Sequence, residues 1–342
     1  MTVLVFAPNW LGDAVMALPA VADLRRYAAD GRLVVAARPS VAGLWRMVPG
    51  INDVVTIAGA RGRARWGALG ANVRTVEQVH ADVAVLLPHS FHTALVARRA
   101  GIPERWGYRR GLRGWLLSRA VARPSATVHQ VDSYRHLVAA SGIDNGPRTP
   151  RLEASPDAVD SARALLIDHG WTPGRRLLGL APGAAYGGAK RWPPDRFGRV
   201  AGGLGRSHGA VAVLVGSDAD RGAAWAIEAE LDKIGQTDGR LAAINLVGRT
   251  DLRQLAGVLA LCAAFVSNDS GAMHLAAALG VPVVALFGPT DDRVTAPIAD
   301  RARVLTSAAW CRPCLLRECP LDHRCMTGIG ADAVVRAAGE ML

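Results

Sequence analysis

Asp13 is the residue of the N-terminal segment that is best suited to proton transfer. It lies within residues 7–16, where a turn containing Gly12 separates an apolar run from a helical pattern. The dipole of a helix favours negative charge at its N-terminus, so the Asp13 carboxylate stays ionised and can accept a proton as a general base. The alternative is that Asp13 is the N-cap of that helix, the commonest task of an aspartate at such a place.

A segment of small residues with a single lysine, 181–193, is suited to holding a phosphate group. It reads Ala-Pro-Gly-Ala-Ala-Tyr-Gly-Gly-Ala-Lys-Arg-Trp-Pro and follows an apolar run. Small side chains let the backbone come close to a ligand, and Lys190 supplies a positive charge. The spacing is not that of a Walker loop. The alternative is a surface loop in which Lys190 and Arg191 are simply solvated.

A third segment, 267–276, combines the end of an expected strand with the start of an expected helix. Asp269 or Ser270 opens that helix, and Gly271 falls in its first turn. Free backbone N–H groups at such an end attract an anion, and the glycine lets a ligand approach. His274 lies on the same first turns and can reach that ligand. The alternative is an ordinary capped helix with His274 in the core.

Four cysteines are concentrated near the end of the sequence, in the pattern Cys311-x2-Cys314-x4-Cys319-x5-Cys325, with His323 among them. Their density fits metal ligation, although the spacing matches no common zinc finger. Three interpretations stay open: a structural metal site, a disulfide-stapled loop and plain reduced thiols. We expect this loop to be structural rather than catalytic.

Two further patterns are discounted. Gly203-Leu204-Gly205 follows no strand-to-helix turn, so it is not a dinucleotide-binding fingerprint. Asp218-Ala219-Asp220 has the form of a metal-binding acidic pair, but we expect these residues to be solvated loop carboxylates.

Short β-rich runs alternate with helical stretches along the chain, which predicts parallel sheets with right-handed crossovers. Residues 144–156 hold three prolines and an Asn-Gly pair and are expected to form a linker. The chain is therefore expected to form two Rossmann-like α/β domains, 1–150 and 151–342, with parallel sheets facing a central cleft and ligands at the carboxyl ends of the strands. The segment 105–117, rich in Arg, Gly and Trp, is expected to be an irregular loop. The expected strands are 3–7, 33–37, 54–57, 83–87, 177–181, 210–215, 243–247, 264–267 and 282–287, and the main expected helices are 14–29, 92–100, 155–169, 196–208, 221–234, 252–260 and 271–279.

The positive charge of the chain is concentrated in its first half. The formal net charge is +11, and residues 1–155 hold 20 arginines against ten acidic residues, whereas the remainder is almost neutral. A basic surface indicates an anionic partner, which can be a nucleic acid, a membrane surface or a phosphorylated substrate. Aromatic residues make up only 5% of the chain, which argues against a nucleic-acid-binding module.

Features that the sequence lacks indicate the cellular setting. No apolar run approaches the roughly 18 residues of a membrane-spanning helix. No basic start or cleavage site marks a secretory signal. Five cysteines in a chain of 342 residues do not make a disulfide framework. We expect a globular protein of the cytoplasm.

Taken together, these motifs resemble the heptosyltransferases of glycosyltransferase family 9. The resemblance covers nearly the whole chain and implies a GT-B fold, with an N-terminal acceptor domain and a C-terminal donor domain that carries the Cys-rich loop 311–325. It implies transfer of L-glycero-D-manno-heptose from ADP-heptose to the inner core of lipopolysaccharide, with inversion at the anomeric carbon. The partners are then the ADP-sugar, an anionic lipopolysaccharide-core acceptor and an anionic membrane face touched peripherally at the inner membrane. The residues that carry the resemblance are 8–13, 87–95, 100–103, 182–193, 267–271 and 288–290.

The resemblance also assigns roles by position. Asp13 is the general base, and Lys190 holds the diphosphate that leaves, so that no further cofactor is required. The loop 183–186 lacks the hydroxyl pair found in some relatives, which leaves its donor contacts to the backbone or to Tyr186. The expected donor-binding residues are Gly183, Ala184, Ala185, Tyr186, Lys190, Asp269, Ser270, Gly271 and His274. The uneven charge adds two basic loops, one with Arg61, Arg63 and Arg65 and one with Arg105, Arg109, Arg110 and Arg113, which are expected to bind phosphates and sugar acids of the acceptor. The expected acceptor-binding residues are Ser90, His92, Arg61, Arg63, Arg65, Arg109 and Arg110.

Other functions compete with this interpretation. Within the enzyme class, the alternative is a family 9 ADP-sugar transferase that acts on another acceptor, such as a secondary metabolite. Outside it, a nucleic-acid binder would show weak, salt-sensitive polymer binding without ADP-sugar binding. A non-catalytic ADP-sugar sensor would bind ADP-heptose tightly without turnover.

Overall fold

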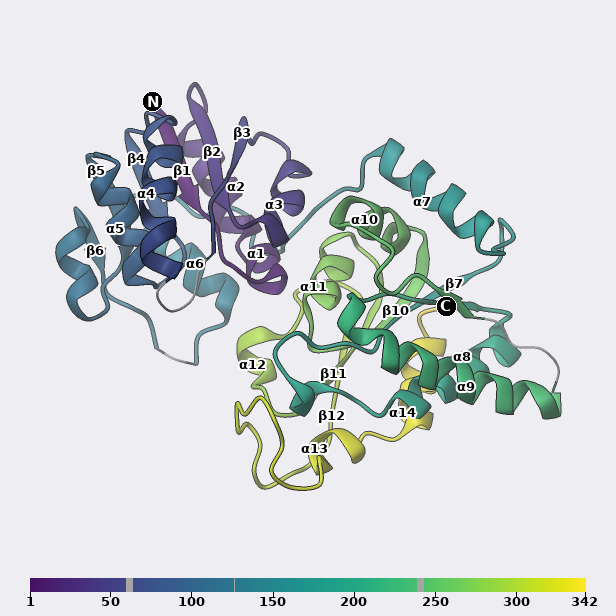
Figure 1. Ribbon diagram of the computed structural model, residues 1–342. Coiled ribbons are helices and arrows are strands. Elements are labelled where there is room, and N and C mark those ends of the chain that lie inside the picture. Colours follow the sequence, from purple (N-terminus) through teal and green to yellow (C-terminus); the bar gives the residue numbers. More distant parts are fainter. Residues whose placement is uncertain (60–63, 126, 239–242) are drawn as a thin grey trace. The chain divides into compact units, whose positions relative to one another are not determined.

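The computed structural model describes residues 1–59, 64–125, 127–238 and 243–342, apart from the side chains of residues 64–66 and 236–238. The chain divides into two compact units, Met1–Arg151 and Leu152–Leu342, which are described separately. Each unit is built on one six-stranded sheet covered by helices (Figure 1).

The sheet of the first unit is parallel throughout and has the strand order β3-β2-β1-β4-β5-β6. Val3 pairs with Leu33 on one side and with Val83 on the other, which places β1 at the centre. The central strands are almost continuously apolar because helices cover both faces of a parallel sheet. The strands are β1 (Thr2–Phe6), β2 (Arg32–Ala37), β3 (Asp53–Thr56), β4 (Val83–Leu86), β5 (Glu104–Tyr108) and β6 (Arg119–Val121).

Helices connect these strands and bury an apolar core that includes Leu4, Phe6, Val34 and Leu86. They are α1 (Leu11–Met16), α2 (Leu18–Tyr27), α3 (Pro39–Arg46), α4 (Ala64–Glu77), α5 (Phe91–Arg99) and α6 (Gln130–Ala139), with a 3-10 helix, η1, at Gly111–Leu116.

The second unit repeats the same topology. Its parallel sheet has the order β12-β11-β10-β7-β8-β9, so its first strand, β7, is again next to its fourth, β10. The strands are β7 (Leu177–Ala181), β8 (Val211–Leu214), β9 (Ala243–Asn245), β10 (Cys262–Asn268), β11 (Val283–Phe287) and β12 (Ala302–Thr306).

The helices of this unit enclose a core that contains Trp192, Phe197, Val266 and Met326. They are α7 (Pro156–Asp168), α8 (Pro194–His208), α9 (Arg221–Asp238), α10 (Leu252–Ala260), α11 (Gly271–Ala278), α12 (Asp292–Thr295), α13 (Arg324–Thr327) and α14 (Ala331–Gly339), with 3-10 helices η2 (Gly188–Lys190) and η3 (Asp218–Asp220).

Two expectations about the first unit are wrong. The stretch 14–29 is not one helix: α1 and α2 are separated at Ala17, because Pro19 has no N–H to continue the hydrogen bonding of α1. The stretch 105–117 is not an irregular loop: it contributes most of β5 and all of η1. Arg105 is tolerated in β5 because its Nε donates to the Leu116 carbonyl, 2.8 Å away. The strands β6 and β12 were not predicted from the sequence.

Candidate functional site

A pocket of about 410 Å³ in the first unit lies where the order of its sheet reverses, between β1 and β4. Connections from neighbouring strands leave in opposite directions at such a point, which opens a crevice at the carboxyl ends of the strands. The residues after β1 and β4 line the pocket, together with the start of α6. Its lining includes Asn9, Trp10, Asp13, His89, Ser90, Arg110, Arg123, Gln130 and Tyr134.

Asp13 is the third residue of α1 and lines this pocket. The N-cap position belongs to Trp10, which makes no side-chain cap, so the alternative that Asp13 is the N-cap is wrong. Tyr134 lines the same pocket, and burial together with the negative charge of Asp13 raises the pKa of Tyr134 well above its usual range. The pocket therefore holds a carboxylate beside a phenol that stays protonated.

The other predicted acceptor-binding residues are distributed unevenly. Ser90 lines the pocket, and its hydroxyl caps α5 by accepting from the Thr93 amide at 3.1 Å. Arg110 also lines the pocket, whereas Arg109 is exposed nearby without being part of the lining. His92 lies in the first turn of α5 outside the lining, with Nε2 3.5 Å from the Asn72 amide nitrogen. Arg61 and Arg63 lie outside the described residues, and Arg65 belongs to α4, where its side chain is not described.

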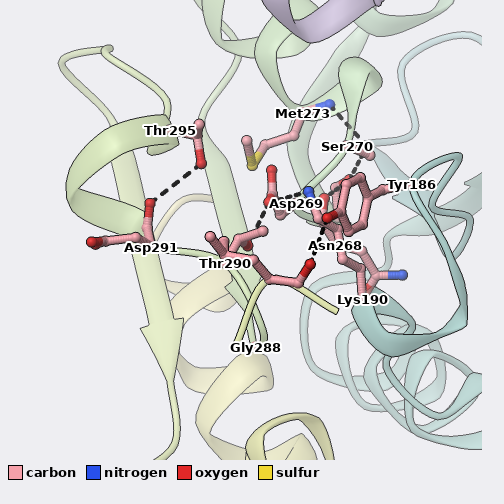
Figure 2. Close-up of polar contacts among 12 residues, drawn as sticks. Tyr186, Lys190, Asn268, Asp269, Ser270, Met273, Gly288, Thr290, Asp291 and Thr295 are labelled. Carbon is pink, nitrogen blue, oxygen red and sulfur yellow. Dashed lines mark hydrogen bonds and ion pairs between the residues drawn. The ribbon is translucent and has the colours of Figure 1, made fainter. Parts of the chain in front are cut away.

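In the second unit, the reversal of strand order between β7 and β10 brings two predicted segments together (Figure 2). The Nζ atom of Lys190, from the segment after β7, lies 2.6 Å from Oδ2 of Asp269, which directly follows β10. The hydroxyl of Thr290, which follows β11, donates to the same Asp269 oxygen at 2.6 Å. The Lys190 ammonium also lies 4.8 Å from the centre of the Tyr186 ring.

Asn268, the last residue of β10, fixes both ends of the Lys190 loop. Its side-chain nitrogen donates to the Pro182 carbonyl at 2.7 Å, and its side-chain oxygen accepts from the Trp192 amide at 3.1 Å. Because Asn268 is completely buried, water does not compete for these bonds. One side chain thus closes the loop that carries Lys190.

The helix α11 begins beside this loop. Ser270 is its N-cap and accepts from the Met273 amide at 3.4 Å, and Gly271 is its first residue. The expected helix start is therefore present, with its free N–H groups beside the Lys190–Asp269 pair (Figure 2). His274 lies in the same turn and is buried.

Close packing explains the small residues after β7. A Cβ atom at Gly183 would collide with the carboxylate of Asp220, so a larger residue there would have to displace the Asp220 side chain. Asp220 accepts from the Ser217 hydroxyl at 2.8 Å and lies 3.4 Å from a guanidinium nitrogen of Arg191. The expectation of two solvated carboxylates is thus wrong for Asp220, which is buried, whereas Asp218 is exposed.

The sequence profile of glycosyltransferase family 9 (heptosyltransferase) matches residues 70–324. The chain is a member of glycosyltransferase family 9. It is 33% identical over 310 residues to lipopolysaccharide heptosyltransferase 2 of Salmonella typhimurium, covering 89% of this chain and 88% of that protein. It is 32% identical to lipopolysaccharide heptosyltransferase 2 of Escherichia coli over the same shares of the two chains.

Solved structures agree with this assignment. The ADP-heptose lipopolysaccharide heptosyltransferase II of E. coli matches all of this chain and 98% of its own, with a TM-score of 0.81 and 29% identity. A family 9 glycosyltransferase from Veillonella parvula matches 99% of this chain and 96% of its own, with a TM-score of 0.83 and 22% identity. The predicted GT-B fold and the predicted enzyme class, a glycosyltransferase, are confirmed. No helix in the described parts of the chain is long and apolar enough to cross a membrane.

The Cys-rich loop of this family 9 enzyme packs against the Lys190 loop. The Tyr186 hydroxyl donates to the Leu315 carbonyl at 2.6 Å, the Gly188 amide donates to the Glu318 carboxylate at 3.0 Å, and the Ala189 amide donates to the Arg317 carbonyl at 2.9 Å. The loop therefore supports the segment that presents Lys190, which is a structural task.

The thiols of this loop are all free in the structure. Cys325 is buried, and burial together with the neighbouring thiols Cys311, Cys314 and Cys319 raises its pKa. Within the described residues, no three His, Cys, Asp or Glu side chains are arranged to hold a metal ion.

Several residues of the two sites were missed by sequence reasoning. Asn268 and Thr290 stand next to recognised motifs, but only the fold shows that they contact the Lys190 loop and Asp269. Arg123 follows the unpredicted strand β6 and was not among the expected residues, whereas Arg113 belongs to a basic loop that was expected to bind the acceptor. The arginine type of Arg123 was the one available signal, and it is shared by many residues of the same unit.

Proposed function

We propose that this glycosyltransferase moves L-glycero-D-manno-heptose from ADP-heptose to the inner core of lipopolysaccharide, with inversion at the anomeric carbon. The relatives named as lipopolysaccharide heptosyltransferase 2 support this substrate pair. The observation that carries the proposal is the Lys190–Asp269 pair at the start of α11, because a fixed ammonium beside free helix amides suits a diphosphate.

On the donor side, charge develops on the ADP oxygens as the bond to the anomeric carbon breaks. The Lys190 ammonium and the N–H groups of Gly271 and its neighbours are already in place to stabilise that charge. The backbone of residues 183–186 and the buried His274 complete the donor site in this proposal. No further cofactor is assigned in this proposal, in which the Lys190 ammonium and the N–H groups at the start of α11 hydrogen-bond to the diphosphate.

On the acceptor side, Asp13 removes the proton from the attacking hydroxyl. The electron pair of that oxygen forms the new bond to the anomeric carbon on the face opposite ADP, while the old bond breaks and its electrons leave with the β-phosphate. This displacement inverts the anomeric carbon, and the proton ends on Asp13. The pocket around Asp13 also offers Ser90 and Arg110 to the acceptor.

We place this reaction at the cytoplasmic face of the inner membrane, which the enzyme touches peripherally. Leu112 and Trp115 support the contact: both are largely exposed, and in a 3-10 helix residues i and i+3 share one face. Arg109 and Arg110 precede this apolar face. Exposed aromatic and apolar side chains beside basic residues suit an anionic lipid surface.

Turnover of ADP-heptose against a panel of truncated core acceptors, read by product mass, tests the proposal. We expect a mass gain of one heptose on an inner-core acceptor, with ADP-glucose as the control donor. If heptose were transferred only to an acceptor other than lipopolysaccharide, the proposed acceptor would be wrong, whereas the assignment as a glycosyltransferase would stand. Tight ADP-heptose binding without turnover on any acceptor would indicate a sensor instead.

A further inference from the structure

The pocket of the first unit concentrates positive charge. Arg110, from the segment after β5, and Arg123, from the segment after β6, both line it and are both exposed. Among the described residues, neither guanidinium takes part in an ion pair, and Asp13 is the one carboxylate in the lining. The lining thus holds two cationic groups and a single acid.

A third arginine, Arg113, is not part of the lining, but its charge acts on the lining residue His89. The side chain of Arg113 is only 1% exposed, and its Nη2 atom makes a long 3.4 Å hydrogen bond to the Leu86 carbonyl at the end of β4. Its Nε and Nη1 atoms are buried without a hydrogen-bond partner in the described structure. A buried guanidinium without a counter-charge is costly, so this arrangement is suited to an anion that arrives from outside the chain.

His89 lies close enough to the three arginines for their charges to change its pKa. It lines the pocket directly after Leu87 and Pro88, and its Nδ1 atom is buried without a partner among the described residues. Burial, and then the charges of Arg123, Arg113 and Arg110, lower its pKa to about 4. The imidazole is therefore neutral near pH 7 and can hydrogen-bond to an anion, while the three guanidiniums supply the charge.

We propose that Arg110, Arg123 and His89, which line the pocket, form with the buried Arg113 a subsite for a phosphate or carboxylate group of the acceptor beside Asp13. Its role in acceptor binding rests on the proposed function, whereas its affinity for an anion does not. Guanidinium groups bind such groups through paired N–H donors. The subsite orients the acceptor so that the hydroxyl to be glycosylated meets the Asp13 carboxylate. It is distinct from the diphosphate site around Lys190, which belongs to the second unit.

Direct anion binding is the first test. Radiolabelled inorganic phosphate is equilibrated with the full-length enzyme in saturating ADP, which fills the diphosphate site. We expect one additional phosphate site, weakened at least tenfold by Arg110→Gln or Arg123→Gln, since one charge-assisted hydrogen bond is worth about a tenfold change or more. The matched control is Arg99→Gln, an exposed arginine in the last turn of α5, which should bind phosphate like the wild type. Wild-type enzyme without this second site, or binding that survives both pocket substitutions, would overturn the subsite.

The second test identifies the source of the anion. Acceptor KM is measured with an intact core acceptor, a phosphatase-treated one and one with esterified carboxylates. Arg123→Gln should raise KM about ten- to hundredfold on the intact acceptor, with little effect on the acceptor that lacks the recognised anion. An equal effect on all three acceptors contradicts recognition of an acceptor anion. If no acceptor is turned over but phosphate still binds, the proposed function fails and the anion subsite stands.

Discussion

Lys190 and Asp269 form an ion pair whose atoms Nζ and Oδ2 lie 2.6 Å apart, between the segment after β7 and the segment after β10. Both side chains are largely buried, with 12% and 6% exposure. Thr290 donates to the same carboxylate oxygen, so Asp269 is held from a third strand as well. An ammonium has three N–H donors, which leaves two for a ligand. The pair therefore fixes the ammonium in place for the diphosphate that we propose it binds.

Replacing Lys190 by Ala should raise the donor KM at least tenfold and lower kcat, because a charge is lost from the leaving group's site. It should also destabilise the enzyme by a few kcal/mol, since removing one partner leaves the buried Asp269 charge uncompensated. Adding Asp269→Asn should then recover thermal stability without recovering activity. Steady-state kinetics and thermal denaturation measure the two effects.

Lys233, the other lysine of the chain, provides the matched control. It lies on α9, is 74% exposed and approaches Glu230 only at 3.6 Å. Lys233→Ala should therefore leave donor KM, kcat and stability at wild-type values. Unchanged ADP affinity and rate in Lys190→Ala would reject the phosphate-binding role.

Replacing Asp13 by Asn keeps the size of the side chain but removes its ability to accept a proton. We expect near-normal folding and ADP binding, with a rate loss on the order of 10²–10⁴. Asp30→Asn, an exposed aspartate of the same unit, is the control. Single-turnover rates measure catalysis, and circular dichroism measures folding. Near-normal turnover in Asp13→Asn would show that Asp13 is not the general base.

The hydrogen bond between Tyr186 and the Cys-rich loop can be tested by a substitution that removes a single oxygen atom. Tyr186→Phe removes the hydroxyl that donates to the Leu315 carbonyl but keeps the ring beside the Lys190 ammonium. We expect a several-fold rise in donor KM with acceptor KM unchanged, because the loop that presents Lys190 loses a support. Tyr27→Phe, an exposed tyrosine of the first unit, should change neither constant. An unaltered donor KM in Tyr186→Phe would show that the contact does not position the loop.

The proposed membrane contact predicts vesicle binding. Wild-type enzyme should co-sediment with vesicles that contain anionic lipid, and Leu112→Ser with Trp115→Ser should reduce the bound fraction several-fold because apolar area no longer enters the interface. Trp225→Ser, a similarly exposed tryptophan on α9, is the control and should bind like the wild type. Equal binding of the double variant and the wild type would show that Leu112 and Trp115 do not make the membrane contact.

Much of the fold could be predicted because buried parallel strands are continuous apolar runs. The strand β7 was predicted with its observed bounds, Leu177–Ala181. The strand β5 was missed because Arg105 and Gly107 interrupt its run of apolar residues. Both residues are nevertheless buried in the folded strand. The edge strand β12 is only partly buried and gives a weak signal. Apolar patterning thus identifies the centre of a sheet better than its edges.

The candidate sites were predictable to the extent that their residues follow a strand. Asp13, Lys190 and Asp269 were found because each stands at a strand-to-helix transition. The bonds of Asn268 to both ends of a loop, and the burial of Arg113 without a full set of partners, depend on tertiary contacts. No local sequence pattern encodes such contacts. The alternation of strands and helices therefore predicts where a site lies but not which side chains complete it.

His89 predicts how stability depends on pH. Its pKa is about 4 in the folded enzyme and near 6.5 in the unfolded chain, so between these values the unfolded state binds the proton more readily. Its contribution to stability is therefore complete above about pH 6.5 and is lost as the pH falls toward 4. The substitution His89→Gln removes this titrating group. Between pH 7 and pH 5, the melting temperature of the variant should therefore fall less than that of the wild type. His80→Asn, at an exposed histidine of the same unit, should keep the wild-type dependence.

Phosphate should modify this dependence if the arginine subsite exists. Burial is the largest cause of the low pKa of His89, and the charges of Arg123, Arg113 and Arg110 add to it. An anion held between these guanidiniums offsets their charge, so the pKa of His89 should rise part of the way toward 6.5. With ADP and phosphate both saturating, the fall in wild-type melting temperature between pH 7 and pH 5 should become smaller, and Arg123→Gln should not respond to phosphate. A wild-type pH dependence that is identical with and without phosphate would mean that the bound anion and His89 do not interact.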